Sequence, residues 1–281
     1  MINLAALFLP AGTAIVAPTA TKRLLRSFAA SLFVSLSLAS QPASATQPVT
    51  PQPATPQPAT PQSTGVQITQ LKAPLPFEAQ YKANYNGYEF GNLVTRRLER
   101  LPNGEFRHSY RADYLLYFLQ EESVLQIDGC NLRPLRYELE RGTFLKKKRT
   151  AISFDWKKRI ASYEYKGKSG TFPLVANAID PMNAMLRVAC QLTTEKKTLS
   201  FPQVDDNKIE TQDYRLLGPE TLDTANGKIN TIRVERVHDN NRQTLLWLMA
   251  SNPTIVVRGY QRDKDGSIYK LELLRWKLLA P

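Results

Sequence analysis

The sequence predicts an all-β fold in which one helix covers a strongly curved antiparallel meander, either a half-barrel or an open barrel. Three observations support this prediction. Apolar and polar residues alternate through much of the chain from Pro76 onward, short turn signals separate these runs, and only Asp180–Leu192 has helical periodicity. A lone amphipathic helix in a sheet-rich chain must bury its apolar stripe, and the concave face of the sheet is the natural place.

The N-terminal region has the features of an export signal. A basic segment at 22–26 precedes an apolar stretch at 27–39, and Ala43-Ser44-Ala45 supplies a small-x-small cleavage pattern. The apolar stretch is too short to span a bilayer, which takes about 20 residues. We therefore predict a signal peptide with an extended N-terminus at 1–45, cleavage near Ala45, and a periplasmic mature protein without a transmembrane span. The true start of translation within 1–21 stays open.

A proline-rich, disordered linker is predicted at 46–75, ahead of a single β-rich domain at 76–281. Its core is three pentapeptide copies at 47–61, QPVTP, QPATP and QPATP. Proline at this density excludes helix and sheet and favours polyproline II. The segment is either a passive spacer or a tether with a docking role, and the sequence leaves both open.

The chain is basic, with 37 Lys and Arg against 25 Asp and Glu and a net charge of +12. The part after the predicted signal peptide keeps +9, because residues 1–45 carry three cations and no acid. Such an excess favours anionic surfaces in general, namely lipid head groups, anionic glycans or nucleic acid. Export makes nucleic acid a poor partner.

Short turn signals divide the predicted domain into hairpins. The signals are Asn86-Gly87, Asn103-Gly104, Asp128-Gly129, Asn226-Gly227 and Asp265-Gly266. The predicted strands lie at 76–85, 88–101, 105–118, 121–128, 134–142, 145–155, 159–166, 198–204, 209–217, 228–238, 242–249, 254–263 and 268–278. Connections this short produce an antiparallel meander, because parallel strands need long crossovers.

Two strand segments break the alternation. In 269–278 the apolar phase shifts by one residue after Leu273, which indicates a β-bulge or a strand exposed on each face in turn. The continuous apolar run at 115–119 is either buried on both faces or an exposed apolar lip that contacts lipid or a partner.

The helix at 180–192 has a clear start and one apolar stripe. Asp180 is a good N-cap, and Pro181 suits the first helical position. Met182, Met185 and Leu186 recur at helical spacing, followed by Ala189 and Leu192.

No motif for catalysis, metal or cofactor binding is evident. His108 and His238 are the only histidines, they are far apart in sequence, and no cluster has metal-ligand spacing. The acid pairs Glu121-Glu122 and Asp205-Asp206 lie on or beside predicted strands, where neighbours face opposite ways, so we expect them to be solvated. We therefore predict a protein that is not an enzyme and has no cofactor.

Cys130 and Cys190 are the only cysteines, and an oxidising periplasm permits a disulfide between them. Such a bond would tie a hairpin turn to the helix, but the sequence does not show that the two residues meet. The disulfide stays an open alternative.

Two basic groups flank the predicted strand at 150–156, and a hairpin that brought them together would form a basic patch. Its predicted members are Lys146, Lys147, Lys148, Lys157, Lys158 and Arg159. The patch is either a charged edge that prevents aggregation or a site that attracts acidic phospholipid or an anionic glycan.

Several short motifs, the marks given next, occur in an order that resembles an exported bacterial family known as domain of unknown function 3108. The marks are Phe77–Tyr85 with Asn86-Gly87 and Gly91, Arg133-Pro134-Leu135-Arg136-Tyr137, Phe154-Asp155-Trp156, Asp180-Pro181, Leu246-Trp247-Leu248 and Val256-Val257-Arg258. The resemblance covers Pro76–Lys277 and implies a periplasmic, mainly antiparallel domain. The pattern is also similar to the half-barrels of lipoprotein carriers, which is an architectural analogy only.

The functional hypothesis is a non-catalytic binding or envelope-maintenance protein whose curved sheet holds an apolar or lipid-like ligand or a partner protein. Met182, Met185 and Leu186 would form an adaptable lid, and Tyr117 and Phe118 would add apolar contacts. The alternatives are an envelope hydrolase or glycan-processing enzyme, and a scaffold whose groove is filled by its own side chains. The ligand and the oligomeric state stay open.

Overall fold

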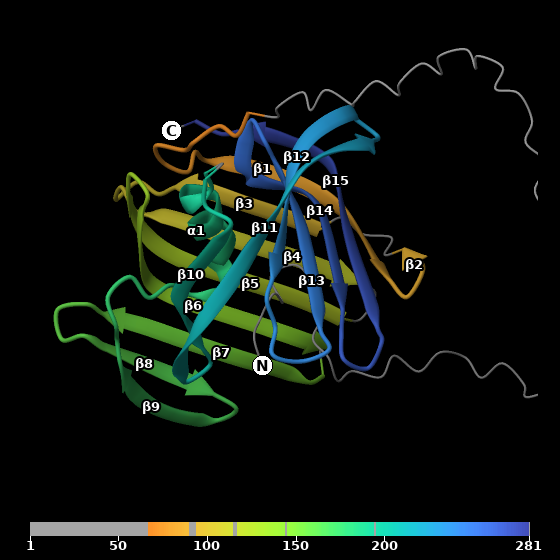
Figure 1. Cartoon of the computed structure of the whole chain (residues 1–281). Helices are drawn as coiled ribbons and strands as arrows, with labels where there is room; N and C mark the ends of the chain where they lie inside the picture. The colour runs from red at the N-terminus through yellow and green to blue at the C-terminus, as the bar shows by residue number, and fades with distance from the viewer. Residues whose placement is uncertain (1–66, 90–93, 115–116, 144, 194, 281) are drawn as a thin grey trace, which may run out of the picture. The chain divides into compact units, whose positions relative to one another are not determined.

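The computed structural model describes residues 67–89, 94–114, 117–143, 145–193 and 195–280, which all belong to one compact unit (Figure 1). The predicted signal peptide and the proline-rich repeats lie outside these residues. Contacts with the sheet begin before Pro76. Ile68 packs against the core, and the backbone N–H of Thr69 donates to the carbonyl oxygen of Ala250 at 2.9 Å.

One antiparallel sheet dominates the structure. Its strands are β1 (Phe77–Tyr85), β2 (Tyr88–Glu89), β3 (Val94–Arg100), β4 (Phe106–Tyr114), β5 (Tyr117–Asp128), β6 (Asn131–Thr143), β7 (Lys147–Asp155), β8 (Ile160–Tyr165), β9 (Lys168–Pro173), β10 (Thr198–Asp205), β11 (Lys208–Thr224), β12 (Gly227–Arg236), β13 (Gln243–Met249), β14 (Asn252–Arg262) and β15 (Ile268–Leu278). The order is β10-β11-β12-β13-β14-β15-β1-β3-β4-β5-β6-β7-β8-β9, with β2 paired to β1. The sheet is not closed into a barrel, and the predicted fold class is confirmed.

The short helical segment connects the two edges of this sheet. It consists of a 3₁₀ turn, η1 (Pro181–Asn183), followed by α1 (Ala184–Gln191), and it lies between edge strands β9 and β10 in the chain. The turn contacts β4, β5 and β10, and α1 contacts β10 and β14. Because these strands come from distant parts of the sheet, the sheet curves around the helix (Figure 1).

The predicted apolar stripe of the helix is buried. Met182, Met185 and Leu186 are 2%, 6% and 0% exposed and belong to the main hydrophobic core, as does Leu192. Burying several such side chains stabilises the fold by roughly 1.5–3 kcal/mol each.

Two local features follow the sequence closely. Asn86 and Gly87 form a two-residue hairpin turn in which both have positive φ, 49° and 90°, as expected for an Asn-Gly turn. The apolar phase shift is a β-bulge, because Gln80 pairs with Arg275 and Tyr81 pairs with Leu273, which leaves Leu274 without a partner position.

Several strand predictions were wrong. Within the predicted strand at 88–101 the structure describes β2 and β3, and residues 90–93 lie outside the described residues. In place of the predicted strand at 105–118 it has β4, which ends at Tyr114, and β5, whose first residue Tyr117 pairs with Tyr114. Leu115 and Leu116 lie outside the described residues, while Leu119 is buried and Tyr117 and Phe118 are half-buried. Strand β9 was missed because it is an edge strand with little apolar alternation.

Strand β11 is longer than predicted. The prediction ended it at residue 217, directly before Gly218-Pro219, two residue types that are uncommon inside a strand. A register shift at this point, with Leu216 paired to Val234 and Gly218 paired to Arg233, lets the strand continue to Thr224.

Candidate functional site

The N-terminus of the helix carries a buried polar network. The backbone N–H of Asn183 donates to the Asp180 Oδ1 carboxylate oxygen at 2.9 Å, which is the N-cap that the sequence predicted. The Asn183 side-chain amide donates to Asp180 Oδ2 at 2.8 Å and to Ser123 Oγ at 2.7 Å. The Ser123 hydroxyl donates to Asp180 Oδ2 at 2.6 Å. Strand β5 is thereby joined to the start of the helix.

His108 on β4 extends the network toward β3. Arg96 Nε donates to His108 Nε2 at 3.0 Å, so Nε2 carries a lone pair and the proton lies on Nδ1. The Nδ1–H then donates to Asn183 Oδ1 at 2.9 Å. Arg96 also donates through Nη1 to the Thr254 carbonyl oxygen at 3.0 Å, and its guanidinium lies 5.2 Å from the centroid of the Phe77 ring.

Burial shifts the pKa values of the carboxyl groups in this region. It raises the pKa of Asp180 to about 6, although hydrogen bonds from Ser123 and Asn183 favour the ionised form. Burial raises the pKa of Glu121 to about 8, against the hydrogen bond that the Tyr137 hydroxyl donates to Glu121 Oε1 at 2.7 Å. Burial, and then Arg96, hold the pKa of His108 well below its usual value, so the imidazole is neutral.

The network has the wrong connections for nucleophilic catalysis. Ser123 donates to Asp180 and not to the histidine, and the His108 Nε2 that would act as a base accepts from Arg96. Ser123, His108, Asp180 and Asn183 are each 0% exposed, so a substrate has no access to them. Their arrangement satisfies buried polar groups and fixes the helix to the sheet.

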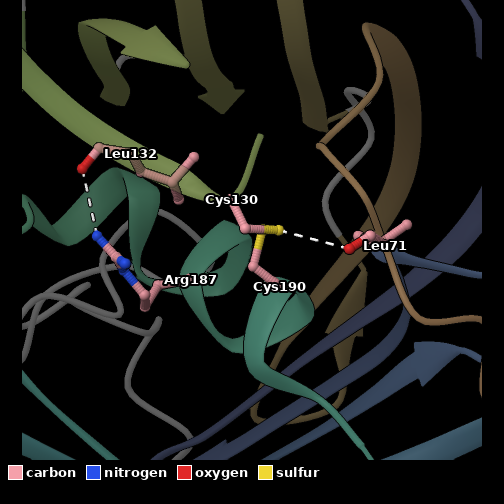
Figure 2. Close-up of a disulfide and its surroundings, with 5 residues drawn as sticks. All are labelled: Leu71, Cys130, Leu132, Arg187 and Cys190. Atoms are coloured by element: carbon pink, nitrogen blue, oxygen red, sulfur yellow. Dashed lines mark hydrogen bonds between the residues drawn. A yellow bond between two sulfur atoms is a disulfide. The ribbon is translucent and has the colours of Figure 1, made fainter. Parts of the chain in front are cut away.

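A disulfide holds the other end of the helix. Cys130, in the β5–β6 turn, is bonded to Cys190 on α1, with Cα atoms 5.6 Å apart (Figure 2). This is the pairing that the sequence left open. Arg187 Nη2 donates to the Leu132 carbonyl oxygen at 3.2 Å, beside the disulfide (Figure 2). The Cys130 sulfur also lies 3.6 Å from the Leu71 carbonyl oxygen, a close contact, because a disulfide sulfur carries no hydrogen.

The apolar residues proposed to bind a ligand are not brought together. Met182, Met185 and Leu186 lie in the core under the sheet. Tyr117 and Phe118 lie at the start of β5, five or more residues from Ser123, where η1 meets that strand. At about 3.4 Å per residue, Phe118 is roughly 17 Å along the strand from the helix contact.

The predicted single basic patch is wrong. Lys147 and Lys148 are the first residues of β7 and Lys146 directly precedes them, whereas Lys157, Lys158 and Arg159 follow the end of this strand. A hairpin brings together residues on either side of its turn, but these two groups flank one strand and are roughly 25 Å apart. At the start of β7, Lys147 pairs with Glu140 at 3.4 Å and lies 5.2 Å from the Phe118 ring centroid.

Two surface clefts adjoin Trp156, just after the end of β7. One has a volume of about 480 Å³ and the other about 550 Å³, and Arg133 and Trp156 line both. Lys157 borders the first cleft, and Arg159, Leu174 and Val175 border the second. Lys157 and Arg159 were predicted members of the basic patch, but Arg133 and Trp156 were not predicted to join them, although a tryptophan directly before a Lys-Lys-Arg turn was a usable signal.

Packing holds the indole of Trp156 in place. Its Nε1–H donates to the Pro134 carbonyl oxygen at 2.6 Å, and its ring stacks on Phe154 with centroids 6.1 Å apart. The Arg133 guanidinium lies 5.5 Å from the Trp156 ring centroid. The Trp156 indole is therefore held in a defined position at both clefts and forms an aromatic platform there.

The other residues named from the sequence have local roles. His238 Nε2 hydrogen-bonds with Thr244 Oγ1 at 2.9 Å, apart from the His108 network, and burial lowers its pKa to about 4. The expectation that both acid pairs are solvated was wrong for Glu121 and Asp205, which are buried. Within the described residues no group of three or more His, Cys, Asp or Glu could hold a metal ion. No helix in this part of the chain has the length and apolar character to cross a membrane.

Comparison with known proteins identifies the family. Residues 80–274 match the family described as "Protein of unknown function (DUF3108)". The chain belongs to this family. The resemblance inferred from the order of short sequence motifs is thus confirmed. Among curated proteins, no relative matches the chain.

Solved structures show similarity to this DUF3108 chain in fold alone. A beta-barrel-like protein of domain of unknown function DUF1849 from Brucella abortus superposes with a TM-score of 0.51 at 8% identity, over 75% of this chain and 100% of the other. The hypothetical lipoprotein YmcC from Escherichia coli (K12) covers 76% of this chain and 93% of its own, at 10% identity. Its TM-score of 0.26 is too low to support an inference.

Proposed function

We propose that this protein is an exported, non-catalytic binding protein of the bacterial envelope that binds its ligand on the outside of a filled sheet, at the Trp156 clefts. One observation carries the proposal. Arg133, Lys157 and Arg159 surround the indole, and none of them forms an ion pair with an acidic side chain of the described residues. Cations without acidic partners beside an aromatic platform favour an anionic ligand.

Binding in the interior has less support. The helix is bonded to β5 and β4 at its start and to the β5–β6 turn near its end. A lid made of Met182 and Met185 would have to leave the core and break one of these connections. We therefore propose that the interior is a scaffold filled by its own side chains and that the ligand binds at the surface.

The hydrolase alternative is not favoured by a specific observation. A catalytic group must contact its substrate, and the side chains of the His108 network are sealed from solvent. Ser123, His108 and Asp180 are also hydrogen-bonded to Asn183 or to one another at the start of the helix.

Native mass spectrometry of the protein purified from its own periplasm tests the proposal. We expect a bound small molecule that is lost or depleted in the R133Q/R159Q variant. The matched control is K146Q/K148Q, which removes the same charge from two exposed lysines at the opposite end of β7. A protein without any adduct, or an adduct equally depleted in the control, would contradict a ligand site at Trp156.

A further inference from the structure

An exposed apolar ridge lies beside the second Trp156 cleft. Ile160, the first residue of β8, is 38% exposed and pairs with Pro173 at the end of β9. Val175 lies in the connection that follows β9. It is 46% exposed and also lines the cleft. Exposed apolar side chains next to a charged cleft are typical of an interaction site.

The turn that carries the cations is well ordered by its own hydrogen bonds. The backbone N–H of Lys158 donates to Asp155 Oδ1 at 2.9 Å, and Arg159 adopts the left-handed conformation with φ of 56°. The backbone N–H of Leu174 donates to the Arg159 carbonyl oxygen at 2.9 Å, which joins the apolar ridge to the basic turn. The backbone of the basic turn and the backbone next to the apolar ridge are therefore held side by side.

The charged residues that line these clefts are mostly basic. The second cleft is lined by Arg133 and Arg159 and by no acidic residue. Asp155 is the one acid that lines the first cleft, and Lys158 pairs with it at 3.3 Å. A guanidinium presents several N–H donors in a plane that matches the oxygens of a phosphate group.

We propose that this end of the sheet docks on an anionic lipid surface. One lipid phosphate occupies the cleft between Arg133 and Arg159, and Ile160 and Val175 enter the apolar region beside it. The indole of Trp156 then lies at the level of the head groups, where tryptophan is enriched in membrane-associated proteins. This inference rests on the proposed function and specifies its ligand as a lipid phosphate.

Vesicle sedimentation tests the docking surface. The full exported protein is mixed with vesicles of phosphatidylglycerol and phosphatidylcholine, or of phosphatidylcholine alone. We expect stronger binding to the vesicles that contain phosphatidylglycerol. One basic residue near an anionic surface contributes roughly a 5-fold gain in affinity, so the R133Q/R159Q variant should bind about 25-fold more weakly. The K146Q/K148Q control should bind as the unmodified protein does.

Two further variants separate the contributions. The R133K/R159K variant keeps the charge but loses the planar donor pair, and we expect intermediate binding. The I160S/V175S variant should weaken binding to vesicles without changing the binding of soluble glycerol phosphate. Circular dichroism of each variant verifies that the fold is retained.

The outcomes distinguish the inference from the function on which it rests. Equal binding to both kinds of vesicle, or an equal loss in the K146Q/K148Q control, overturns the docking surface. If soluble glycerol phosphate binds in an Arg133-dependent manner but vesicles do not, lipid docking is wrong and the proposed binding function stands. If neither binds and no adduct co-purifies, both proposals are wrong.

Discussion

The buried carboxyl of Glu121 should make the stability of the protein depend on pH in a way that one substitution removes. Its pKa is raised from 4.5 to about 8 by burial, with Asp180 adding to the increase and Tyr137, Arg141 and Arg96 opposing it. Between these two pKa values the folded protein holds one proton more than the unfolded chain. The free energy of unfolding therefore falls as pH rises, by about 1.4 kcal/mol per pH unit from this group.

The E121Q variant tests this directly, since a neutral amide of the same size can still accept the Tyr137 hydrogen bond. Between pH 6.0 and 7.5 the unmodified protein should lose about 2 kcal/mol of unfolding free energy relative to E121Q. Asp180 contributes little in this window because its pKa is about 6, and both proteins share the contribution of His108. Urea denaturation followed by circular dichroism at several pH values measures the difference.

The neighbouring residue provides the control. Glu122 faces the other side of β5, where its carboxylate lies 3.4 Å from Arg107 Nε, and it is half-buried. The E122Q variant should follow the pH dependence of the unmodified protein. Parallel curves for the unmodified protein and E121Q would refute the argument, because they would mean that Glu121 is ionised in the folded state.

Three further predictions concern the helix and the N-terminus. Breaking the disulfide with C130S/C190S should lower the unfolding free energy by about 4 kcal/mol, since the bond closes a loop between residues 60 apart, and an unchanged urea midpoint would contradict this. The N183A variant should lose about 3 kcal/mol of unfolding free energy, because it removes side-chain hydrogen bonds to Ser123 and Asp180 and leaves the buried His108 Nδ1–H without its acceptor; a loss below 1 kcal/mol in urea denaturation would count against the network. Intact-mass analysis of the periplasmic protein should show a chain that begins at Thr46, and a chain that retains residues 1–45 would disprove signal cleavage.

Local sequence determined the hairpin turns, the bulge and the helix start of this fold. Asn86-Gly87 adopts positive φ at both positions because asparagine and glycine tolerate it at low cost. The phase shift after Leu273 indicated an irregularity, either a bulge or a strand exposed on each face in turn, and the structure has the bulge, since side chains on a strand alternate with a period of two residues. Asp180 caps the helix through a bond to a residue only three positions away. Each feature depends on interactions within a few residues, so the sequence alone was sufficient.

Only the tertiary structure decided which distant residues meet. His108 and Asn183 are 75 residues apart, and Ser123 and Asn183 are 60 apart, so no spacing in the sequence predicted their hydrogen bonds. The second Trp156 cleft likewise combines Arg133 from β6 with Val175 from the connection after β9. Such contacts depend on how far the sheet curves and on which strands become neighbours. Curvature and strand order are set by packing of the whole domain around the helix, and local patterns of residues do not contain them.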